Sequence, residues 1–503
     1  MPVTIVEKDN RFEYKASEGG LATGLGSIYK QADNIWIGWT GNVLPHEDRK
    51  EVTATLAKDN LQPVFLTKHE VNCFYKGFSN ETLWPLFHSF PSYTKYDPEF
   101  WTCFKEVNRK FADAILDVAD EGDTIWIHDY QLMLVPQMVR EQMPGAEIGF
   151  FQHIPFPSQE LFRLLPWREE LLKGVLGADL VGFHTYDDVR HFLSAVTRLS
   201  KLEANAHEIK VDGRIVVADA FPISIDYDKF ANMAESGLTR RNEVKLKKMT
   251  NNTKLLISID RLDYSKGILQ RLNAYKLFLE RYPEFHGKVT YIHLVVPSRD
   301  SVLKYKELKE EMNKLISEIN GNYATLSWQP IQYFYRSFPP HLLSALYKAA
   351  DVALVTPMRD GMNLVSKEYI ASQPDKKGVL LLSETAGAAI ELSEALTVNP
   401  NDIWSFADKI REALVLPEEE RINRMTQLQQ TVSRFDIYRW VKNFREKLEE
   451  VKQKQDNSLT KAVTDKLRSD FYNNYSNSKK RLFLLDYDGT VVPFKKEVND
   501  ALP

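Results

Sequence analysis

The sequence predicts an α/β fold made of two doubly wound halves, each an alternation of buried strands and helices. Short apolar runs bounded by polar residues recur along the first half, for example at 123–128, 148–152 and 180–183. The polar segment Asn251–Thr253 interrupts this alternation, and a second alternating half begins with the strand Lys254–Ile259. Strands that alternate with helices are typical of parallel sheets with helices on both faces.

Length and composition fit such a fold and exclude several classes of protein. A chain of 503 residues, 43% of them hydrophobic, is long enough for two domains with ample core. The net charge of −4 gives no reason to expect nucleic acid binding. Met1–Asn10 does not read as a signal peptide, and no run of about 18 apolar residues predicts a membrane span. Cys73 and Cys103 make no disulfide framework and belong to no metal-ligand cluster, which suits a reducing cytosol.

The first half opens with glycines and then with aromatic residues. Gly19 and Gly20 precede an expected helix start, where backbone N–H groups can approach a phosphate, although a plain turn is the alternative. An aromatic-rich stretch runs from Tyr75 through Trp84 to His88, and such rings either stack on sugars or form core. Short strands are expected at 34–38 and 63–66.

Polar residues follow two consecutive strands of this half. Asp129 comes directly after the strand 123–128, and His153 after the strand 148–152. The carboxyl ends of parallel strands line the ligand crevice of open α/β sheets. A lone Asp or His there is usually structural, but two in succession favour a site. A further strand is expected at 214–218.

The second half places cations after its strands. The strand that begins at Lys254 leads to Arg261 and Lys266, a guanidinium and an ammonium that could clamp one pyrophosphate, with a solvated basic loop as the alternative. The strand 289–296 leads to Arg299. Further strands are expected at 325–328 and 379–382, and a helical, charged region at 417–451 whose last part could cross back to the first half.

The segment Arg359–Tyr369 follows a buried strand and enters a helix expected to begin near Met362. A helix N-terminus can hold an anion, and Gly361 lets the backbone approach a ligand closely. Asp360 could orient sugar hydroxyls, and Glu368 could accept a hydrogen bond from a ribose. The alternative is an ordinary strand-to-helix corner with a capping carboxylate.

The end of the chain has a different character. Residues 452–480 are polar and predict a linker. An apolar strand expected at 481–485 then leads to Asp486 and Asp488. An Asp-x-Asp-x-Thr loop after a strand can supply a nucleophile and a general acid, usually with Mg²⁺.

Taken in order, these pieces resemble the trehalose-6-phosphate synthases, retaining glycosyltransferases of family 20 with the GT-B fold. The resemblance covers residues 12 to about 450, and it rests on Gly19-Gly20-Leu21, Trp39, Tyr75, Trp84-Pro85, His128-Asp129-Tyr130, His153–Pro157, Arg261–Gly267, Pro297-Ser298-Arg299 and Arg359–Glu368. The stretch Leu482–Thr490 is similar to the start of a trehalose-6-phosphate phosphatase domain of the haloacid-dehalogenase type. The chain is thus expected to be part of a fused synthase–phosphatase protein that is truncated at both ends.

The resemblance implies a domain plan with two Rossmann-like domains facing across a cleft. An acceptor-binding domain is expected at 1–235, and a nucleotide-sugar-binding domain at 236–451, its last helix crossing back to the first domain. A linker at 452–480 and the incomplete start of a phosphatase domain at 481–503 follow. The family's first strand, whose arginine meets the acceptor phosphate, is expected to be missing. Its absence predicts weak acceptor binding and a first half patched by a segment such as Val3–Glu7 or Glu13–Lys15.

The resemblance also implies the reaction, which is transfer of glucose from UDP-glucose to glucose 6-phosphate with retention, giving α,α-trehalose 6-phosphate and UDP. The implied catalytic residues are His153, Asp360, Arg261 and Lys266. The implied donor-binding residues are Gly19, Gly20, Arg261, Lys266, Phe338, Asn363, Leu364, Val365, Ser366, Lys367 and Glu368. The implied acceptor-binding residues are Trp39, Tyr75, Trp84, Asp129 and Arg299. Asp486 and Asp488 are expected to be the vestige of a phosphatase site without activity.

No cofactor and no metal are expected in the synthase part, because Arg261 and Lys266 can neutralise the departing UDP. The acidic pair Asp226 and Asp228 is expected to sit at a helix start or turn. The expected partners are the two small-molecule substrates, with no nucleic acid or membrane, a possible homo-oligomer, and a cytoplasmic location. A regulatory sugar-phosphate-binding protein of low activity, or an enzyme for another phosphorylated acceptor, remains an alternative. The choice between UDP-glucose and GDP-glucose stays open.

Overall fold

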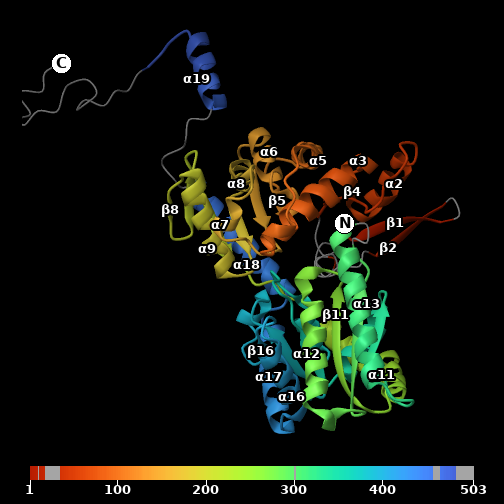
Figure 1. Cartoon of the computed structure of the whole chain (residues 1–503). Coiled ribbons are helices and arrows are strands. Elements are labelled where there is room, and N and C mark those ends of the chain that lie inside the picture. The colour runs from red at the N-terminus through yellow and green to blue at the C-terminus, as the bar shows by residue number, and fades with distance from the viewer. Residues whose placement is uncertain (9–10, 17–25, 27–33, 299–301, 457–464, 483–503) are drawn as a thin grey trace, which may run out of the picture. The chain divides into compact units, whose positions relative to one another are not determined.

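The fold is taken from a computed structural model of the chain, which describes residues 1–8, 11–16, 26, 34–298, 302–456 and 465–482. Two compact units result: one holds residues 1–211 and 215–456, and the other holds 212–214 and 457–503. The first unit contains both large sheets, which Figure 1 shows with β5 in one and β11 in the other.

The second large sheet has six parallel strands in the order β13-β12-β11-β14-β15-β16. Their bounds are β11 Lys254–Arg261, β12 Val289–Val296, β13 Ile331–Tyr335, β14 Val352–Val355, β15 Val379–Ser383 and β16 Leu396–Val398. Counted along the chain this is the Rossmann order 3-2-1-4-5-6, in which the order reverses between β11 and β14. Ligands of such sheets bind outside the carboxyl ends of the strands at this switch point.

The first large sheet has the order β5-β6-β7-β10-β9-β8. Its bounds are β5 Thr124–His128, β6 Glu147–Phe151, β7 Leu180–Phe183, β8 Ala204–Asn205, β9 Glu208–Val211 and β10 Arg214–Ala220. Strands β5, β6, β7 and β10 are parallel neighbours, and β8 pairs antiparallel with β9. The two doubly wound halves predicted from the alternation of strands and helices are therefore confirmed.

Two small sheets precede the first large one. Strand β3 (Trp36–Gly38) pairs in parallel with β4 (Leu61–Pro63), which lies slightly earlier than the strand expected at 63–66. Strands β1 (Val3–Lys8) and β2 (Arg11–Ala16) form an antiparallel pair, and the Ile5 N–H donates to the Thr40 carbonyl. Val3–Glu7 and Glu13–Lys15, either of which was expected to replace the missing strand of the first sheet, thus pair with each other beside the end of β3.

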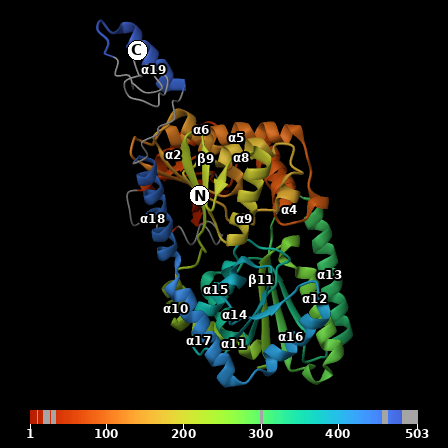
Figure 2. The ribbon, with the colours of Figure 1, turned by 90° about the vertical axis from the view of Figure 1, so that its left-hand side faces the viewer.

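Helices cover both large sheets (Figures 1 and 2). Those of the first half are α2 Arg49–Leu56, α3 Lys68–Glu70, the π-helix η2 Val71–Leu83, α4 Trp84–Phe87, α5 Pro98–Leu116, α6 Val135–Gln142, α7 Gln159–Phe162, α8 Arg168–Val175, α9 Tyr186–Ala195 and the π-helix η5 Val196–Ser200. Those of the second half are α10 Tyr227–Glu235, α11 Gly237–Met249, α12 Ile268–Arg281, α13 Leu303–Tyr323, α14 Pro340–Ala349, α15 Leu364–Ala371, α16 Ile403–Val415, α17 Glu418–Arg434 and α18 Ile437–Asp456. Short 3₁₀ turns join them: η1 Ala57–Asp59, η3 Pro91–Tyr93, η4 Tyr130–Leu132, η6 Tyr264–Lys266, η7 Pro283–Phe285 and η8 Gly387–Ile390.

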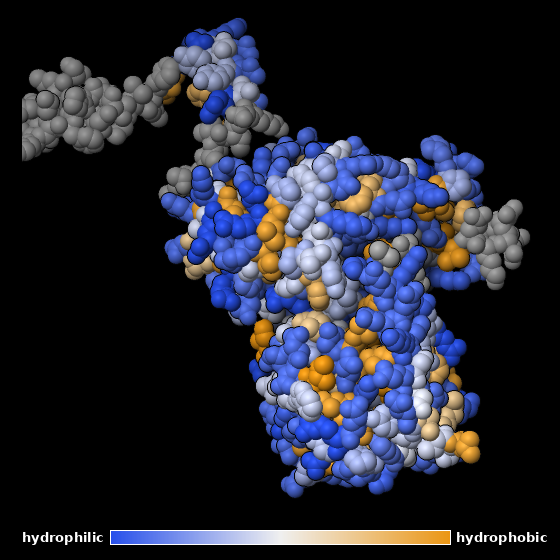
Figure 3. Space-filling view, in the orientation of Figure 1, coloured by the Kyte–Doolittle hydropathy of each residue, from blue (hydrophilic) through white to orange (hydrophobic). Residues whose placement is uncertain are grey.

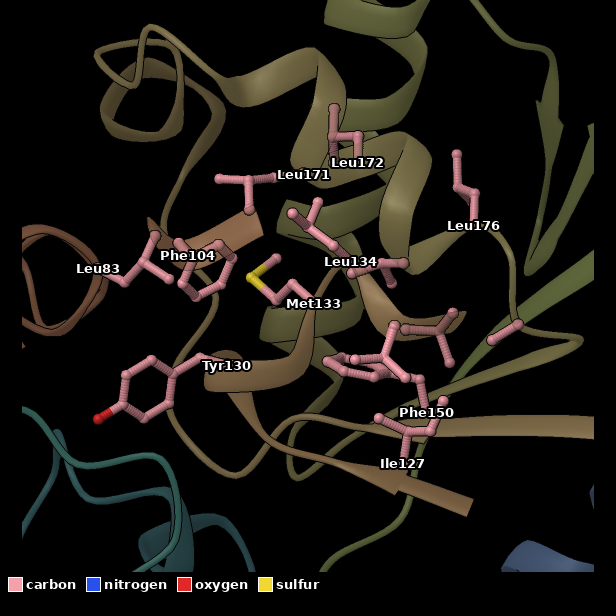
Figure 4. Packing of buried hydrophobic residues seen from close by; sticks show 14 of the residues in the cluster. Leu83, Phe104, Ile127, Tyr130, Met133, Leu134, Phe150, Leu171, Leu172 and Leu176 are labelled. Carbon is pink, nitrogen blue, oxygen red and sulfur yellow. The ribbon is translucent and has the colours of Figure 1, made fainter. Parts of the chain in front are cut away.

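Buried side chains fill the space between the first sheet and its helices. Figure 4 shows Met133 between Phe104 and the leucines of α8, with Ile127 and Phe150 below on the sheet. On the face of the molecule in Figure 3, hydrophilic residues predominate and apolar ones form small groups. Among the described helices, none is both long and apolar enough to cross a bilayer.

Helix α18 packs on the first sheet although it follows the whole second half. Phe444 stacks on Trp126 of β5 with ring centroids 4.4 Å apart, and Trp440 stacks on the same indole at 4.9 Å. A Cβ added to Gly149 or Gly182 would lie 2.7 Å from the Phe444 ring, so glycines in β6 and β7 make room for it. The last helix of the first compact unit is therefore held by the sheet that carries Asp129 and His153.

Some expected elements differ in the structure. The strand expected at 325–328 is only an isolated bridge, and the neighbouring segment Ile331–Tyr335, after Pro330, forms β13 instead. The region 417–451 contains two helices, and the residues expected to form a linker at 452–480 include the end of α18 and helix α19 (Asp465–Asn477). Helix α15 begins at Leu364, just after Met362. Residues 483–503, with Asp486, Asp488 and the expected start of a phosphatase domain, lie outside the described residues.

Candidate active site

The loops after β11 and β14 are tied together at the switch point of the second sheet. Met358 N–H donates to the Ser265 carbonyl over 2.7 Å. Gly267 has φ of 63°, and a Cβ added there would lie 2.3 Å from the Thr356 carbonyl oxygen. Only glycine meets both demands without strain, so this residue allows the two loops to touch. Lys266, which follows β11, is thereby held beside the segment that contains Asp360.

Lys266 and Asp360 form an ion pair at this point. Lys266 Nζ lies 2.6 Å from Asp360 Oδ2, and Asn363 Nδ2 donates to the same oxygen over 3.1 Å. Burial by itself would raise the pKa of Asp360, but the charge and the hydrogen bond of Lys266 outweigh it and lower the pKa below its usual value. Asp360 is therefore a fixed carboxylate, four residues before Leu364, the first residue of α15.

Helix α15 turns its N-terminus toward this pair. Asn363, with φ of 80°, caps the helix by accepting the Ser366 N–H, and the amides of Leu364 and Val365 belong to the first turn, where N–H groups lack partners in the helix. Glu368 accepts a hydrogen bond from Tyr347 Oη over 2.8 Å. Burial raises the pKa of Glu368 against that hydrogen bond. The helix start and Glu368 thus stand one turn apart, a spacing that suits a diphosphate and a ribose.

His153 follows β6 of the first sheet and contacts the backbone of residues 359–363, the segment after β14 that we call the Asp360 segment. A Cβ added to Gly361 would lie 2.6 Å from the His153 carbonyl oxygen, so the two halves of the chain approach each other here. His153 Nε2 lies 3.1 Å from His128 Nδ1. Burial lowers the pKa of His153 well below its usual value and that of His128 to about 3, so both rings are neutral. Among the described residues, His153 Nδ1 is buried without a hydrogen-bond partner, which leaves it free for a ligand.

Asp129 has a strained backbone beside His153. Its φ of 76° and ψ of 164° lie in a region that is nearly restricted to glycine and that marks functional sites in other residues. Asp129 Oδ1 accepts the N–H groups of Tyr130 and His153. The carboxylate therefore links the loops after β5 and β6.

Aromatic rings connect the first half to Arg261. Trp84 Nε1 donates to Asp263 Oδ1 over 3.4 Å, and the Arg261 guanidinium lies 5.7 Å from the Trp84 ring centroid. Tyr75 packs on Trp39 with ring centroids 5.4 Å apart. Trp84 is thus a ring of the first half that contacts Arg261, the last residue of β11.

The remaining predicted site residues make contacts of other kinds or are not described. Phe338 packs on Phe334 at the end of β13, with Arg336 over its ring. Lys367 directs its ammonium away from the helix start, to the Ile223 carbonyl and to Glu391. Gly19, Gly20 and Arg299 lie outside the described residues.

Residues 2–450 match the family model of glycosyltransferase family 20. The chain belongs to this family. A bifunctional trehalose-6-phosphate synthase/phosphatase from Thermoproteus tenax is 43% identical over 518 residues, covering 100% of this chain and 70% of that protein. A solved α,α-trehalose-phosphate synthase (UDP-forming) from Burkholderia xenovorans in complex with glucose-6-phosphate superposes with a TM-score of 0.80 at 33% identity, covering 86% of this chain and 97% of that chain. A solved E. coli protein bound with UDP-2-fluoro glucose gives a TM-score of 0.80 at 34% identity, covering 87% and 97%.

The two cysteines of this family 20 chain are bonded to each other. Cys73 and Cys103 form a disulfide between η2 and α5, and His69 lies close enough for its ring nitrogen and both sulfurs to fall within 4.8 Å of one another. The expectation that the two cysteines make no disulfide framework is therefore wrong for this pair. Bonded to each other, the sulfurs are not thiolates, which metals require.

Asp226 and His184 show how well local sequence patterns predict the position of a polar residue. Asp226 caps α10 by accepting the Lys229 N–H, which confirms that the Asp226–Asp228 pair marks a helix start. His184, which the sequence analysis did not select, follows β7 and lies 3.3 Å from Glu391 of the second half. The same strand-end rule that selected His153 applies to His184, whereas nothing in the sequence around Glu391 indicated its role.

Proposed function

We propose that this chain transfers glucose from UDP-glucose to glucose 6-phosphate with retention, and so makes α,α-trehalose 6-phosphate and UDP. The observation that carries the proposal is that Arg261 at the end of β11, the Lys266–Asp360 pair and the start of α15 all belong to the switch point of the second sheet. Two cations and a helix N-terminus suit the diphosphate of a nucleotide sugar. The related structures with glucose-6-phosphate and with UDP-2-fluoro glucose support the same substrate pair.

The donor's diphosphate is proposed to lie between the cations and the amides of Leu364 and Val365. Glu368, oriented by Tyr347, accepts from the ribose hydroxyls, and Phe338 lies near the uracil. Asn363 and Ser366 shape the helix start by capping it. The proposal also keeps Gly19 and Gly20 as backbone contacts to the donor.

The transferring glucose is proposed to lie against His153 and Asp360. The unpartnered His153 Nδ1 meets a sugar hydroxyl, and the Asp360 carboxylate accepts from another. The acceptor, glucose 6-phosphate, is proposed to stack against Trp84, Tyr75 and Trp39, to be held by Asp129, and to place its phosphate at Arg299.

In the chemical step the bond from the anomeric carbon to the UDP oxygen breaks, and a bond to the acceptor hydroxyl oxygen forms on the same face. The acceptor's proton passes to the departing phosphate oxygen. Arg261 and Lys266 stabilise the charge that develops on UDP, which is electrostatic rather than covalent catalysis. The proposal uses no metal ion and no cofactor, so we expect turnover to survive chelators. Since both substrates carry phosphate charges and do not cross membranes unaided, we place the reaction in the cytoplasm.

The test is a coupled assay for UDP release with a panel of free and phosphorylated hexoses, and with UDP-glucose and GDP-glucose as donors. The proposal expects release that depends on glucose 6-phosphate, with trehalose 6-phosphate as the identified product. Turnover only with another phosphorylated sugar would replace the acceptor assignment. Tight binding of both substrates without turnover would instead favour a regulatory sugar-phosphate-binding protein.

A further inference from the structure

A closed ring of polar contacts joins the two halves next to the candidate active site. His184 follows β7 of the first sheet, and Ile223 follows β10. Lys367 belongs to α15, and Glu391 follows η8 of the second half. We call these four residues the interhalf latch.

The contacts of the interhalf latch form a circuit. Ile223 N–H donates to His184 Nδ1 over 3.0 Å, whereas His184 Nε2 faces Glu391 Oε1 over 3.3 Å without the geometry of a hydrogen bond. Lys367 Nζ donates to the same Glu391 oxygen over 2.9 Å and to the Ile223 carbonyl over 2.8 Å. The side chains of His184 and Lys367 are each only 2% exposed, so water screens the circuit poorly.

These contacts also determine where the protons of His184 and Glu391 lie. Because His184 Nδ1 accepts the Ile223 N–H, the hydrogen of the neutral ring is on Nε2, the nitrogen that faces Glu391. Burial alone would raise the pKa of Glu391, but Lys367 and His184 outweigh it and lower the pKa to about 2. Glu391 is therefore a carboxylate held by one group from each half.

The backbone of η8, which precedes Glu391, connects the interhalf latch to the Asp360 segment by hydrogen bonds. Gly387 N–H donates to the Asp360 carbonyl over 2.9 Å, and Ala388 N–H donates to the Met362 carbonyl over 2.8 Å. A Cβ added to Gly387 would lie 2.0 Å from the Gly361 carbonyl oxygen and 2.8 Å from the His184 ring. The His184 ring, η8 and the Asp360 segment are thus layered without space between them.

We propose that the interhalf latch is a positioning device for the donor site. By holding η8 and α15 against the ends of β7 and β10, it places the Asp360 carboxylate and the α15 amides for the nucleotide sugar. His184, Lys367 and Glu391 are positioning residues that touch no substrate. This proposal rests on the glycosyltransferase function proposed above, and it assigns Lys367 a role other than donor contact.

The first test compares Glu391→Gln with the wild-type chain. The variant keeps the size and an acceptor oxygen but removes the charge that holds Lys367. Because a misplacement of about 1 Å can cost on the order of 10²-fold in rate, we expect kcat/KM for UDP-glucose to fall by about 10–100-fold, with KM for glucose 6-phosphate within about 2-fold. His184→Gln, whose amide can both accept from Ile223 and donate to Glu391, should keep most of the activity that His184→Ala loses.

A second variant separates positioning from stability. Glu391→Gln combined with Lys367→Met removes both buried charges, so its melting temperature should return toward the wild-type value. We expect its kcat/KM for UDP-glucose to remain low. Recovery of kcat/KM together with the melting temperature would overturn the positioning role and leave a stabilising one.

The matched control is Asp179→Asn. Asp179 forms a buried ion pair with Arg140, 2.6 Å apart, within the first half. This variant should lose melting temperature and keep kcat/KM for UDP-glucose. If the wild-type chain itself transfers no glucose, the proposed function fails; if it does and Glu391→Gln matches it, the latch proposal fails alone.

Discussion

Lys266 and Asp360 hold each other at the switch point of the second sheet, with 2.6 Å between ammonium and carboxylate. Their side chains are 12% and 11% exposed, so the pair lies largely out of water. The loop after β11 and the loop after β14 therefore depend on each other for the placement of their charged groups. One residue of the pair belongs to the proposed diphosphate clamp and the other to the proposed glucose site.

Removing either cation of the clamp should slow glucose transfer strongly. We expect Lys266→Ala and Arg261→Ala each to lower kcat by about 10²–10³-fold, the scale for the loss of one preorganised charge-stabilising group. Lys377→Ala, at an exposed lysine paired with Glu418, is the control and should keep full rate. Steady-state UDP release measures all three variants. Wild-type rates in either clamp variant, with the fold intact by circular dichroism, would contradict the assignment.

A methyl group on Gly361 should force apart the two halves of the chain where Gly361 contacts the His153 backbone. The added Cβ would lie 2.6 Å from the His153 carbonyl oxygen, and backbone cannot swing aside as a flexible side chain can. We expect Gly361→Ala to lower both the melting temperature and the transfer rate. Gly237→Ala is the matched control, because nothing lies within 4 Å of its added Cβ, and this change in α11 should be neutral or slightly stabilising. A Gly361→Ala chain as stable and active as the control would show that the halves are not in contact there.

The strand-end rule explains how much of the site could be read from the sequence. Arg261, Asp129 and His153 each follow a continuous apolar strand, and the structure places all three at the carboxyl ends of strands in the expected sheets. The succession of an apolar strand, a polar residue and a helix is contained in a short stretch of chain, so a single sequence reveals it. The same rule applied to the strand 180–183 would have selected His184.

Contacts between distant segments could not be read in this way. Lys367 lies in the predicted donor segment, but its side chain is buried against Ile223 and Glu391, which only the docking of the two halves determines. The Cys73–Cys103 disulfide joins residues separated by 30 positions, and no spacing rule pairs two cysteines of different helices. The strand expected at 325–328 is realised as β13 after Pro330, where Ile331–Tyr335 can pair with β12.

Trp84 should affect the donor side of the reaction through Arg261 and the acceptor side through its own ring. Trp84→Phe removes the N–H that donates to Asp263 and weakens the attraction between the ring and the guanidinium. A cation–π contact contributes about 0.5–2 kcal/mol, and phenylalanine keeps part of it, so we expect kcat/KM for both substrates to fall by about 2–5-fold from this term. The fall for glucose 6-phosphate should be larger if the ring stacks on the sugar. The exposed Trp404→Phe serves as the control. An unchanged kcat/KM in Trp84→Phe would remove Trp84 from the acceptor site.

Acid should destabilise the chain through the buried, neutral His128. An imidazole in the unfolded chain has its usual pKa near 6.5, whereas burial lowers the pKa of His128 to about 3 in the folded chain. Below pH 6.5 the unfolded chain therefore takes up a proton that the folded chain refuses, and the free energy of unfolding falls by about 1.4 kcal/mol per pH unit for this residue until pH 3 is reached. Above pH 6.5 the effect vanishes. His128→Gln should lose this part of the slope, so its unfolding free energy should depend less steeply on pH between 6.5 and 4. Urea denaturation at pH 7, 6 and 5 measures the slopes, with the exposed His46→Gln as the control. Equal slopes for the wild-type chain and His128→Gln would mean that the folded chain protonates this ring as readily as the unfolded one.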